Sequence, residues 1–211
     1  MKRRHPNERE EIDNLKKLNH RHIVKIVSSF THRQYLGVLL WPAVECNLAT
    51  FFNDLDVFET NKILRDFKKS NLGPLHRFGA LGIDVSSCKN AATHAREWMY
   101  RNFACLVEAI CYAHGNKIRH KDLKPSSILL TPVGLRVAGF DSSADFSDLP
   151  SSETSYGKRG TSMYFAPEFG DRKGSGRPAD IFSLGCIFLE MVWSSCMLDQ
   201  TMEDLNEARS F

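Results

Sequence analysis

The sequence predicts an α+β fold, and four stretches of the chain carry that prediction. Residues 7–18 and 95–113 place apolar side chains at the spacing of amphipathic helices. Residues 23–30 and 34–40 are instead rich in β-branched and aliphatic residues, which is typical of strands. With 211 residues and 42% hydrophobic content, the chain is long enough to bury one good core.

The first helix has a start signal and an apolar stripe. Asn7 can cap it, and Glu10 can complete a capping box. The stripe consists of Ile12, Leu15 and Leu18. After the two strands, residues 66–92 are rich in turn-forming residues and predict a loop-like insertion. The helix over residues 95–113 follows, and Gly115 provides its stop.

The charge balance and the apolar runs exclude two classes of partner. The chain has 28 basic and 25 acidic residues, a net charge of +3, and no basic stripe of the kind that binds nucleic acid. The longest apolar run, Ile181–Trp193, contains Glu190 and is too short to span a bilayer. We therefore expect neither nucleic acid nor a membrane as a partner.

The cysteines and the N-terminus predict an intracellular location, in the cytosol or the nucleus. None of the six cysteines forms a C-x-x-C pair, and three lie inside apolar helical patterns, which favours reduced and mostly buried thiols. The first residues, Met1–Pro6, are charged and lack the apolar stretch of a signal peptide.

Residues 118–130 bring acid–base and phosphate-binding chemistry into one short stretch. His120, Asp122 and Lys124 lie within five residues, and a short apolar strand follows them. Asp122 can accept a proton from a hydroxyl group. Lys124 can neutralise a nearby phosphate with its positive charge.

This stretch strongly resembles the catalytic loop of eukaryotic protein kinases of the Ser/Thr type, with Lys121 in place of the usual arginine. Two further stretches resemble the same family in the correct order. Leu135–Asp141 is similar to its metal-binding segment, and Gly160–Glu168 is similar to the end of its activation segment. The details look most like fungal protein kinase domains, and the resemblance covers residues 8–193.

The resemblance implies a two-lobed kinase fold that is incomplete at both ends. Residues 1–43 would form a partial N-lobe of helix C, two strands and the hinge, and residues 44–211 a mostly helical C-lobe. The family's glycine-rich loop and strand lysine do not precede Glu11, and its last helices do not follow residue 193. Because two strands cover a helix less well than five, we expect part of the first helix's apolar stripe to be exposed.

The resemblance also implies roles for individual residues. In the family, the residue at Asp122 accepts the substrate hydroxyl's proton, that at Lys124 contacts the transferred phosphate, and that at Thr161 hydrogen-bonds both. The implied nucleotide-binding residues are Leu40, Trp41, Ala43 and Leu129. The implied structural residues are Glu11, His120, Phe140, Glu168 and Asp180.

Two of these structural residues carry specific expectations. Asp180 begins a stretch, Asp180–Met191, that resembles a buried helix of the family. It is expected to cap that helix and to brace the backbone around His120. Glu168 normally pairs with an arginine from the last helices, so we expect it to lack that partner.

The two metal-binding positions depart from the family's pattern. Ser127 replaces an asparagine that binds Mg²⁺, and its hydroxyl is a shorter and poorer ligand. The order Gly139-Phe140-Asp141 replaces Asp-Phe-Gly, so Gly139 supplies no ligand. Asp141 could substitute only if the loop were rebuilt, because its Cα lies about 6–7 Å further along an extended chain.

These observations leave two functions open. The first is phosphorylation of Ser/Thr hydroxyls on a protein substrate, with ATP and Mg²⁺ as cofactors and with Asp141 or a water-bridged Ser127 holding the metal. The second is a pseudokinase that acts as a scaffold for a protein partner and needs no cofactor. We favour the second for this polypeptide and the first as the function of its family.

Overall fold

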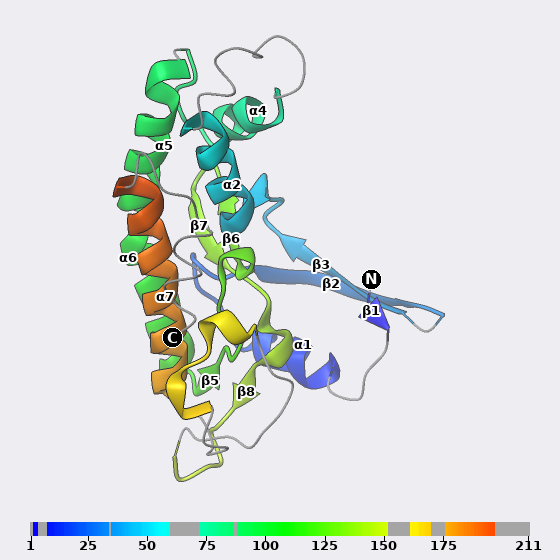
Figure 1. The fold of residues 1–211 in the computed structure, drawn as a ribbon. Helices are drawn as coiled ribbons and strands as arrows, with labels where there is room; N and C mark the ends of the chain where they lie inside the picture. The colour runs from blue at the N-terminus through cyan, green and yellow to red at the C-terminus, as the bar shows by residue number, and fades with distance from the viewer. Residues whose placement is uncertain are drawn as a thin grey trace.

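The computed structural model describes residues 2–3, 8–33, 35–59, 72–86, 88–151, 161–169 and 176–196. Strands and helices follow one another in separate runs along these residues, which confirms the predicted α+β class (Figure 1). The helices are α1 (Glu8–Lys16), α2 (Leu48–Glu59), α4 (Leu72–Ala80), α5 (Cys88–Arg101), α6 (Phe103–Gly115) and α7 (Arg177–Cys196). The strands are β1 (Lys2–Arg3), β2 (Lys25–His32), β3 (Tyr35–Trp41), β4 (Cys46–Asn47), β5 (Ile118–Arg119), β6 (Ile128–Thr131), β7 (Gly134–Val137) and β8 (Ala144–Asp145). Short 3₁₀ turns are η1 (Pro125–Ser127), η2 (Phe140–Ser142), η3 (Ser162–Tyr164) and η4 (Pro167–Phe169).

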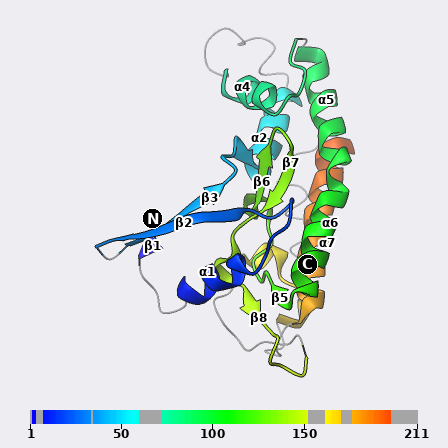
Figure 2. The ribbon, with the colours of Figure 1, turned by 180° about the vertical axis from the view of Figure 1, so that it is seen from behind.

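The N-terminal part consists of α1 and a small antiparallel sheet. β2 and β3 form a long hairpin, and β1 pairs with the other edge of β3, which gives the order β1-β3-β2. Figure 2 shows the hairpin projecting away from the helices. The prediction of two strands was wrong by one, because β1 is only two residues long and carries no strand signal.

The apolar stripe of α1 is buried, so the expectation that part of it is exposed was wrong. Ile12, Leu15 and Leu18 are 8%, 7% and 4% exposed. Leu15 and Leu18 belong to the main core cluster, which also contains Phe140 of η2. The C-terminal part of the chain therefore covers the helix without the help of additional strands.

The exposed apolar surface lies on the hairpin instead. Val27 of β2 is 65% exposed, and Leu39 and Trp41 of β3 are 52% and 53% exposed. Phe30 is also exposed. Both strands of the hairpin thus present large apolar side chains to solvent.

The prediction of a loop-like insertion over residues 66–92 is wrong for the described residues. α4 and the start of α5 are helical there. Residues 60–71 lie outside the described part of the chain.

Packing explains why α4 forms despite its turn-forming sequence. Pro74 stands in the first turn, where its missing N–H removes no helical hydrogen bond. Phe78 is fully buried, and Arg77 forms an ion pair with Asp54 of α2. Tertiary contacts with α2 thus outweigh the local preference for a turn.

The long helix predicted over residues 95–113 is two helices, with a break at Asn102. α5 begins earlier than predicted, and α6 ends at Gly115, the predicted stop. At the break, the Asn102 side chain donates to the backbone carbonyl of Trp98 at 2.7 Å. Such side-chain bonds to the backbone compete with helical hydrogen bonds.

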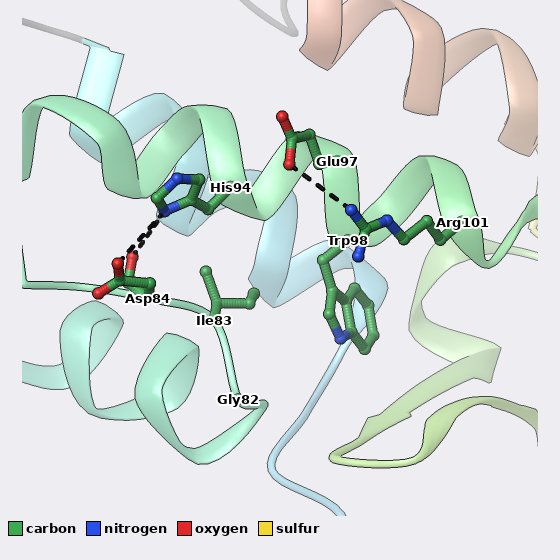
Figure 3. Close-up of a pocket in the computed structure, with 7 residues that line it drawn as sticks. All are labelled: Gly82, Ile83, Asp84, His94, Glu97, Trp98 and Arg101. Carbon is green, nitrogen blue, oxygen red and sulfur yellow. Dashed lines mark hydrogen bonds and ion pairs between the residues drawn. The ribbon is translucent and has the colours of Figure 1, made fainter.

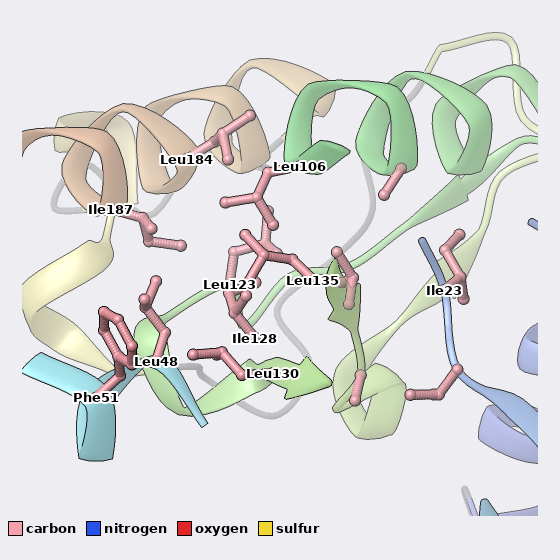
Figure 4. Packing of buried hydrophobic residues seen from close by; sticks show 14 of the residues in the cluster. Ile23, Leu48, Phe51, Leu106, Leu123, Ile128, Leu130, Leu135, Leu184 and Ile187 are labelled. Carbon is pink, nitrogen blue, oxygen red and sulfur yellow. The ribbon is translucent and has the colours of Figure 1, made fainter. Parts of the chain in front are cut away.

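The core lies between α2, α6, α7 and the paired strands β6 and β7 (Figure 4). Each element contributes fully or nearly fully buried aliphatic side chains. These include Leu48 of α2, Leu106 of α6, Ile187 of α7, Leu130 of β6 and Leu135 of β7. The strands β4, β6 and β7 form a second small antiparallel sheet beside this core.

Main-chain hydrogen bonds join the N-terminal part to this second sheet. Ile23 makes a parallel bridge with Val137. The Val24 N–H donates to the Val137 carbonyl at 3.0 Å, and the Val137 N–H donates to the His22 carbonyl at 2.8 Å. The segment between α1 and β2 is therefore fixed to the C-terminal part.

The described cysteines are free thiols, but they are less buried than predicted. Cys46, Cys105 and Cys186 are half-buried, and Cys111 is exposed. Among the described helices, none has the length and hydrophobicity needed to cross a membrane.

Candidate active site

Asp180 of α7 fixes the loop that follows β5. Its carboxylate accepts hydrogen bonds from the backbone N–H groups of His120 and Lys121, each at 2.9 Å, and lies 2.8 Å from Nε2 of His114. The expected bracing of the His120 backbone is present. Because α7 begins at Arg177, Asp180 lies inside its first turn and directs its carboxylate to the loop, so the expectation of a cap was wrong.

The charge of Asp180 is maintained by these contacts. Burial alone would raise the pKa of the Asp180 carboxyl. The hydrogen bonds from His114 and from the two backbone N–H groups together hold that pKa below its usual value. The buried carboxylate therefore remains a strong acceptor for the loop.

His120 is fully buried and packs inside the loop. Its Nε2 lies 2.8 Å from the Ala138 carbonyl, and its Nδ1 accepts the Asp122 N–H at 3.3 Å. Its ring centroid is 4.6 Å from that of Phe140. Burial lowers the pKa of His120, which favours a neutral ring that donates from Nε2 and accepts at Nδ1.

The three predicted catalytic residues lie together. The Lys124 ammonium donates to Oδ2 of Asp122 at 2.8 Å and to Oγ1 of Thr161 at 2.9 Å. The Thr161 backbone N–H donates to the other Asp122 oxygen at 2.9 Å. Since the Asp122 side chain remains 19% exposed, the group is fixed in orientation yet open to a substrate hydroxyl.

Ser127 and Gly139, the two positions that depart from the family's metal-binding pattern, face each other. The Ser127 hydroxyl donates to the Asp122 carbonyl at 3.0 Å, so it is already engaged with the loop. Gly139 has a φ of 78°, and a Cβ built there would lie 3.2 Å from the Ser127 hydroxyl oxygen. The place beside Ser127 that could hold a carboxylate therefore carries only backbone.

Asp141, the predicted substitute ligand, lies in η2 and is half-buried. Within the described residues, no group of three or more His, Cys, Asp or Glu side chains is arranged to hold a metal ion. The donor set at Ser127 and Gly139 thus does not fit Mg²⁺, which prefers several oxygen ligands in near-octahedral geometry.

The predicted nucleotide-binding residues lie on an open surface. Leu40 and Trp41 at the end of β3 are 41% and 53% exposed, and Ala43 is also exposed. Leu129 of β6 is half-buried. The Trp41 ring lies beneath the guanidinium of Arg136, with 5.4 Å between the guanidinium carbon and the ring centroid.

The structure describes the side chain of only one of the two predicted structural glutamates, Glu11 and Glu168. Glu11 lies in α1, but its side chain is outside the described part of the structure. Glu168 lies half-buried in η4, and its negative charge acts on the fully buried guanidinium of Arg119. Arg119 belongs to β5, so the expectation that Glu168 lacks its usual arginine from the last helices stays a prediction.

Sequence reasoning missed the contacts that link α1 to the segment after Phe140. Lys17, directly after α1, forms an ion pair with Asp145 of β8. The Asn14 amide donates to the Ser143 hydroxyl at 3.2 Å. No sequence signal could have found these contacts, because each joins residues more than 120 positions apart.

Comparison with known proteins identifies the family. The model of the protein kinase domain matches residues 80–210, which is more than half of the chain. The chain belongs to the protein kinase family. The matched range includes the loop of Asp122, the glycine at position 139 and α7.

Several curated protein kinases are similar to this chain. Mitogen-activated protein kinase kinase kinase A of Dictyostelium discoideum is 36% identical over 87 residues, or 41% of the chain and 9% of the relative. MAP kinase kinase kinase wis4 of Schizosaccharomyces pombe is 38% identical over 101 residues, or 43% of the chain and 7% of the relative. Mitogen-activated protein kinase kinase kinase 19 of Mus musculus is 28% identical over 192 residues, or 86% of the chain and 12% of the relative. The chain thus spans only a small part of each of these kinases.

Proposed function

We propose that this chain is a protein kinase-like domain that orients a hydroxyl group but transfers phosphate from ATP poorly or not at all. It would act instead as a scaffold for a protein partner. The observation that carries this proposal is the pair formed by Gly139 and Ser127. At the point where the family binds its metal, Gly139 has no side-chain oxygen, and Ser127 has only a short hydroxyl whose position is fixed by its hydrogen bond to the Asp122 carbonyl.

The hydroxyl-binding half of the site supports the kinase-like part of the proposal. Asp122 is held by Thr161 and Lys124, so its carboxylate is oriented before a substrate arrives. A hydroxyl at Asp122 would donate its hydrogen bond to the carboxylate, while Lys124 offers a positive charge to a phosphate. Such preorganisation is a large part of catalysis by electrostatic stabilisation.

The missing ligands support the loss of efficient transfer. Removing one preorganised electrostatic partner often lowers the rate by about 10²–10³. Gly139 and Ser127 change two such partners, and their effects do not simply multiply because the groups act as a unit. Leu40 and Trp41 are also largely exposed, so we expect them to bind the adenine ring of ATP only weakly.

One alternative is residual Ser/Thr kinase activity with ATP and Mg²⁺. It is favoured by the hydrogen bonds that hold Asp122, Lys124 and Thr161 together. A single assay separates the two functions. The full chain is incubated with radiolabelled ATP, Mg²⁺ and a library of Ser/Thr peptides, beside the Asp122→Asn variant. We expect equal background incorporation in both proteins. Turnover by the wild type that the Asp122→Asn variant lacks would instead establish the kinase function.

A further inference from the structure

The helices α4 and α5 begin at the end of the molecule opposite β5 and β8 (Figure 1). A second site lies between these two helices. It is a pocket of about 290 Å³ between α5 and the turn that follows α4. Its lining includes Ile83, Asp84, His94, Glu97, Trp98 and Arg101 (Figure 3). The proposed function leaves this pocket without a role.

The pocket is rich in acceptors of hydrogen bonds. Asp84 accepts the backbone N–H of Ser86 at 2.9 Å, and the hydrogen bonds from Ser86 and the nearby His94 hold the pKa of its carboxyl below the usual value. Nδ1 of His94 lies 3.2 Å from the Asp84 backbone carbonyl. Because a carbonyl only accepts, Nδ1 of His94 carries a proton in this contact.

The charges in the pocket favour a cation over an anion. Asp84 and Glu97 supply two carboxylates, and Arg101 supplies one guanidinium, whose Nη2 lies 3.9 Å from Glu97. These three side chains alone carry a net charge of −1. The Asp84 side chain is 60% exposed, so it is available to a ligand that enters from solvent.

An aromatic surface lies beside these acceptors. The Trp98 indole projects from α5 toward the turn after α4, near Ile83 (Figure 3). Its ring centroid is 5.8 Å from that of Phe51, which is fully buried, so the indole has a fixed support. Tryptophan offers the strongest aromatic face for a cation.

We propose that this pocket binds an arginine side chain from a basic segment of a partner protein. The guanidinium is placed against the Trp98 indole and bonded to Asp84, and its aliphatic stem lies near Ile83. Arginine fits better than lysine because its planar, weakly hydrated head both stacks on aromatic rings and bonds to carboxylates. The carboxylates of the pocket would also attract a polyamine, so the test must distinguish a protein arginine from a polyamine.

The test follows the indole N–H signal of Trp98 by NMR, because one exposed contact gives weak binding. The full chain is titrated with a glycine–serine peptide that carries one central arginine, and the Trp98→Phe variant assigns the signal. We expect a saturable shift of this signal. The same peptide with citrulline, which keeps the shape but lacks the charge, should bind about tenfold more weakly. Equal binding of the citrulline peptide would overturn the proposal.

Substitutions of the charged residues that line the pocket show how each of them contributes to binding. Asp84→Asn should weaken binding about two- to fivefold, as expected for one exposed ion pair. Arg101→Gln should tighten binding, because it removes a like charge and releases Glu97. Asp13→Asn on the distant helix α1 is the matched control and should change nothing. If Arg101→Gln weakens binding of the arginine peptide instead, Arg101 does not act as a like charge and the proposal is wrong.

A competition experiment separates the two sources of a cation. Spermine is added to the complex of wild-type chain and arginine peptide. We expect displacement only at spermine concentrations well above the peptide's own dissociation constant, because an ammonium stacks less well on the indole. Displacement at lower concentrations would assign the pocket to polyamines and overturn the choice of a protein partner.

Discussion

At the scale of single residues, one buried carboxylate holds the loop that identifies the family. Lys121 has a φ of 69°, in the left-handed region that non-glycine residues adopt at a cost. Its backbone N–H and that of His120 are both bonded to Asp180, which is 2% exposed. The two bonds therefore offset the backbone strain next to Asp122.

The Asp180→Asn variant tests this role. An amide has one acceptor oxygen for three donors, so at least one buried N–H group loses its partner. We expect the free energy of unfolding to fall by about 2–4 kcal/mol, measured by urea denaturation. The exposed Asp13→Asn variant is the control and should change it by less than about 0.5 kcal/mol. Equal stability of the two variants would contradict the assigned role of Asp180.

The residue scale is also where the sequence was most informative. The side chains of Asp122, Lys124 and Thr161 were predicted to act together, and the structure brings them together. The prediction succeeded because two of them lie in one short stretch whose residue order fixes the loop. The charge of Glu168 near Arg119 was not predicted, because the sequence carries no local signal of that interaction.

At the scale of elements, the position of α1 depends on contacts with distant parts of the chain. The pair of Lys17 and Asp145 and the bond from Asn14 to Ser143 tie the helix to the segment after Phe140. Burial would raise the pKa of Asp145, but the hydrogen bonds from Lys17 and Ser147 lower it to about 2, against an ordinary value of 3.8.

The direction of the pKa shift of Asp145 determines how the stabilisation by the Lys17–Asp145 pair depends on pH. The folded pKa of Asp145 lies below the unfolded value, so its stabilisation is present above about pH 4 and is lost as the pH falls toward 2. Because Lys17 is 52% exposed, we expect Lys17→Met to cost only about 0.5–1 kcal/mol at pH 7. The difference between wild type and variant should shrink toward zero at pH 2. A difference that stays constant with pH would show that Lys17 acts through packing and not through its charge.

Elements with a strong periodic pattern were predicted from the sequence, and those that depend on packing were not. The pattern of residues 7–18 placed α1, and the runs of β-branched residues placed both strands of the hairpin. α4 was missed because Pro74 was taken as a turn signal, whereas burial of Phe78 against α2 stabilises a helix. Local patterns contain no information on such partners.

At the scale of the whole molecule, the hairpin is the most exposed apolar feature of the described chain. β2 is an edge strand whose neighbour on one side is β3, and Val27 and Leu39 are more than half exposed. Edge strands with exposed apolar side chains favour association with other chains.

We therefore expect the chain to self-associate as its concentration rises. The double variant Val27→Lys and Leu39→Lys should reduce this association, measured by sedimentation velocity, because charges on an edge oppose pairing. It should change the free energy of unfolding by less than about 0.5 kcal/mol, since both side chains face solvent. The control is Val133→Lys on an exposed turn, which should leave the association unchanged. Unchanged association of the double variant would show that the hairpin is not the contact surface.

The central claim is that this kinase-family domain lacks a working metal site because glycine stands at position 139 beside an engaged Ser127. The most direct test measures the shift in melting temperature that ATP causes, with Mg²⁺ and with EDTA. It compares wild type with two double variants, Gly139→Asp/Ser127→Asn and Gly139→Asn/Ser127→Asn. Asp and Asn adopt the left-handed φ of this position more readily than other side chains, so the two double variants carry similar strain and differ chiefly in charge.

We predict that Mg²⁺ changes the ATP-induced shift only in the variant that carries Gly139→Asp. The variant with Gly139→Asn and the wild type should give the same shift with Mg²⁺ and with EDTA. A rise in the melting temperature of the wild type that requires both ATP and Mg²⁺ would contradict the claim.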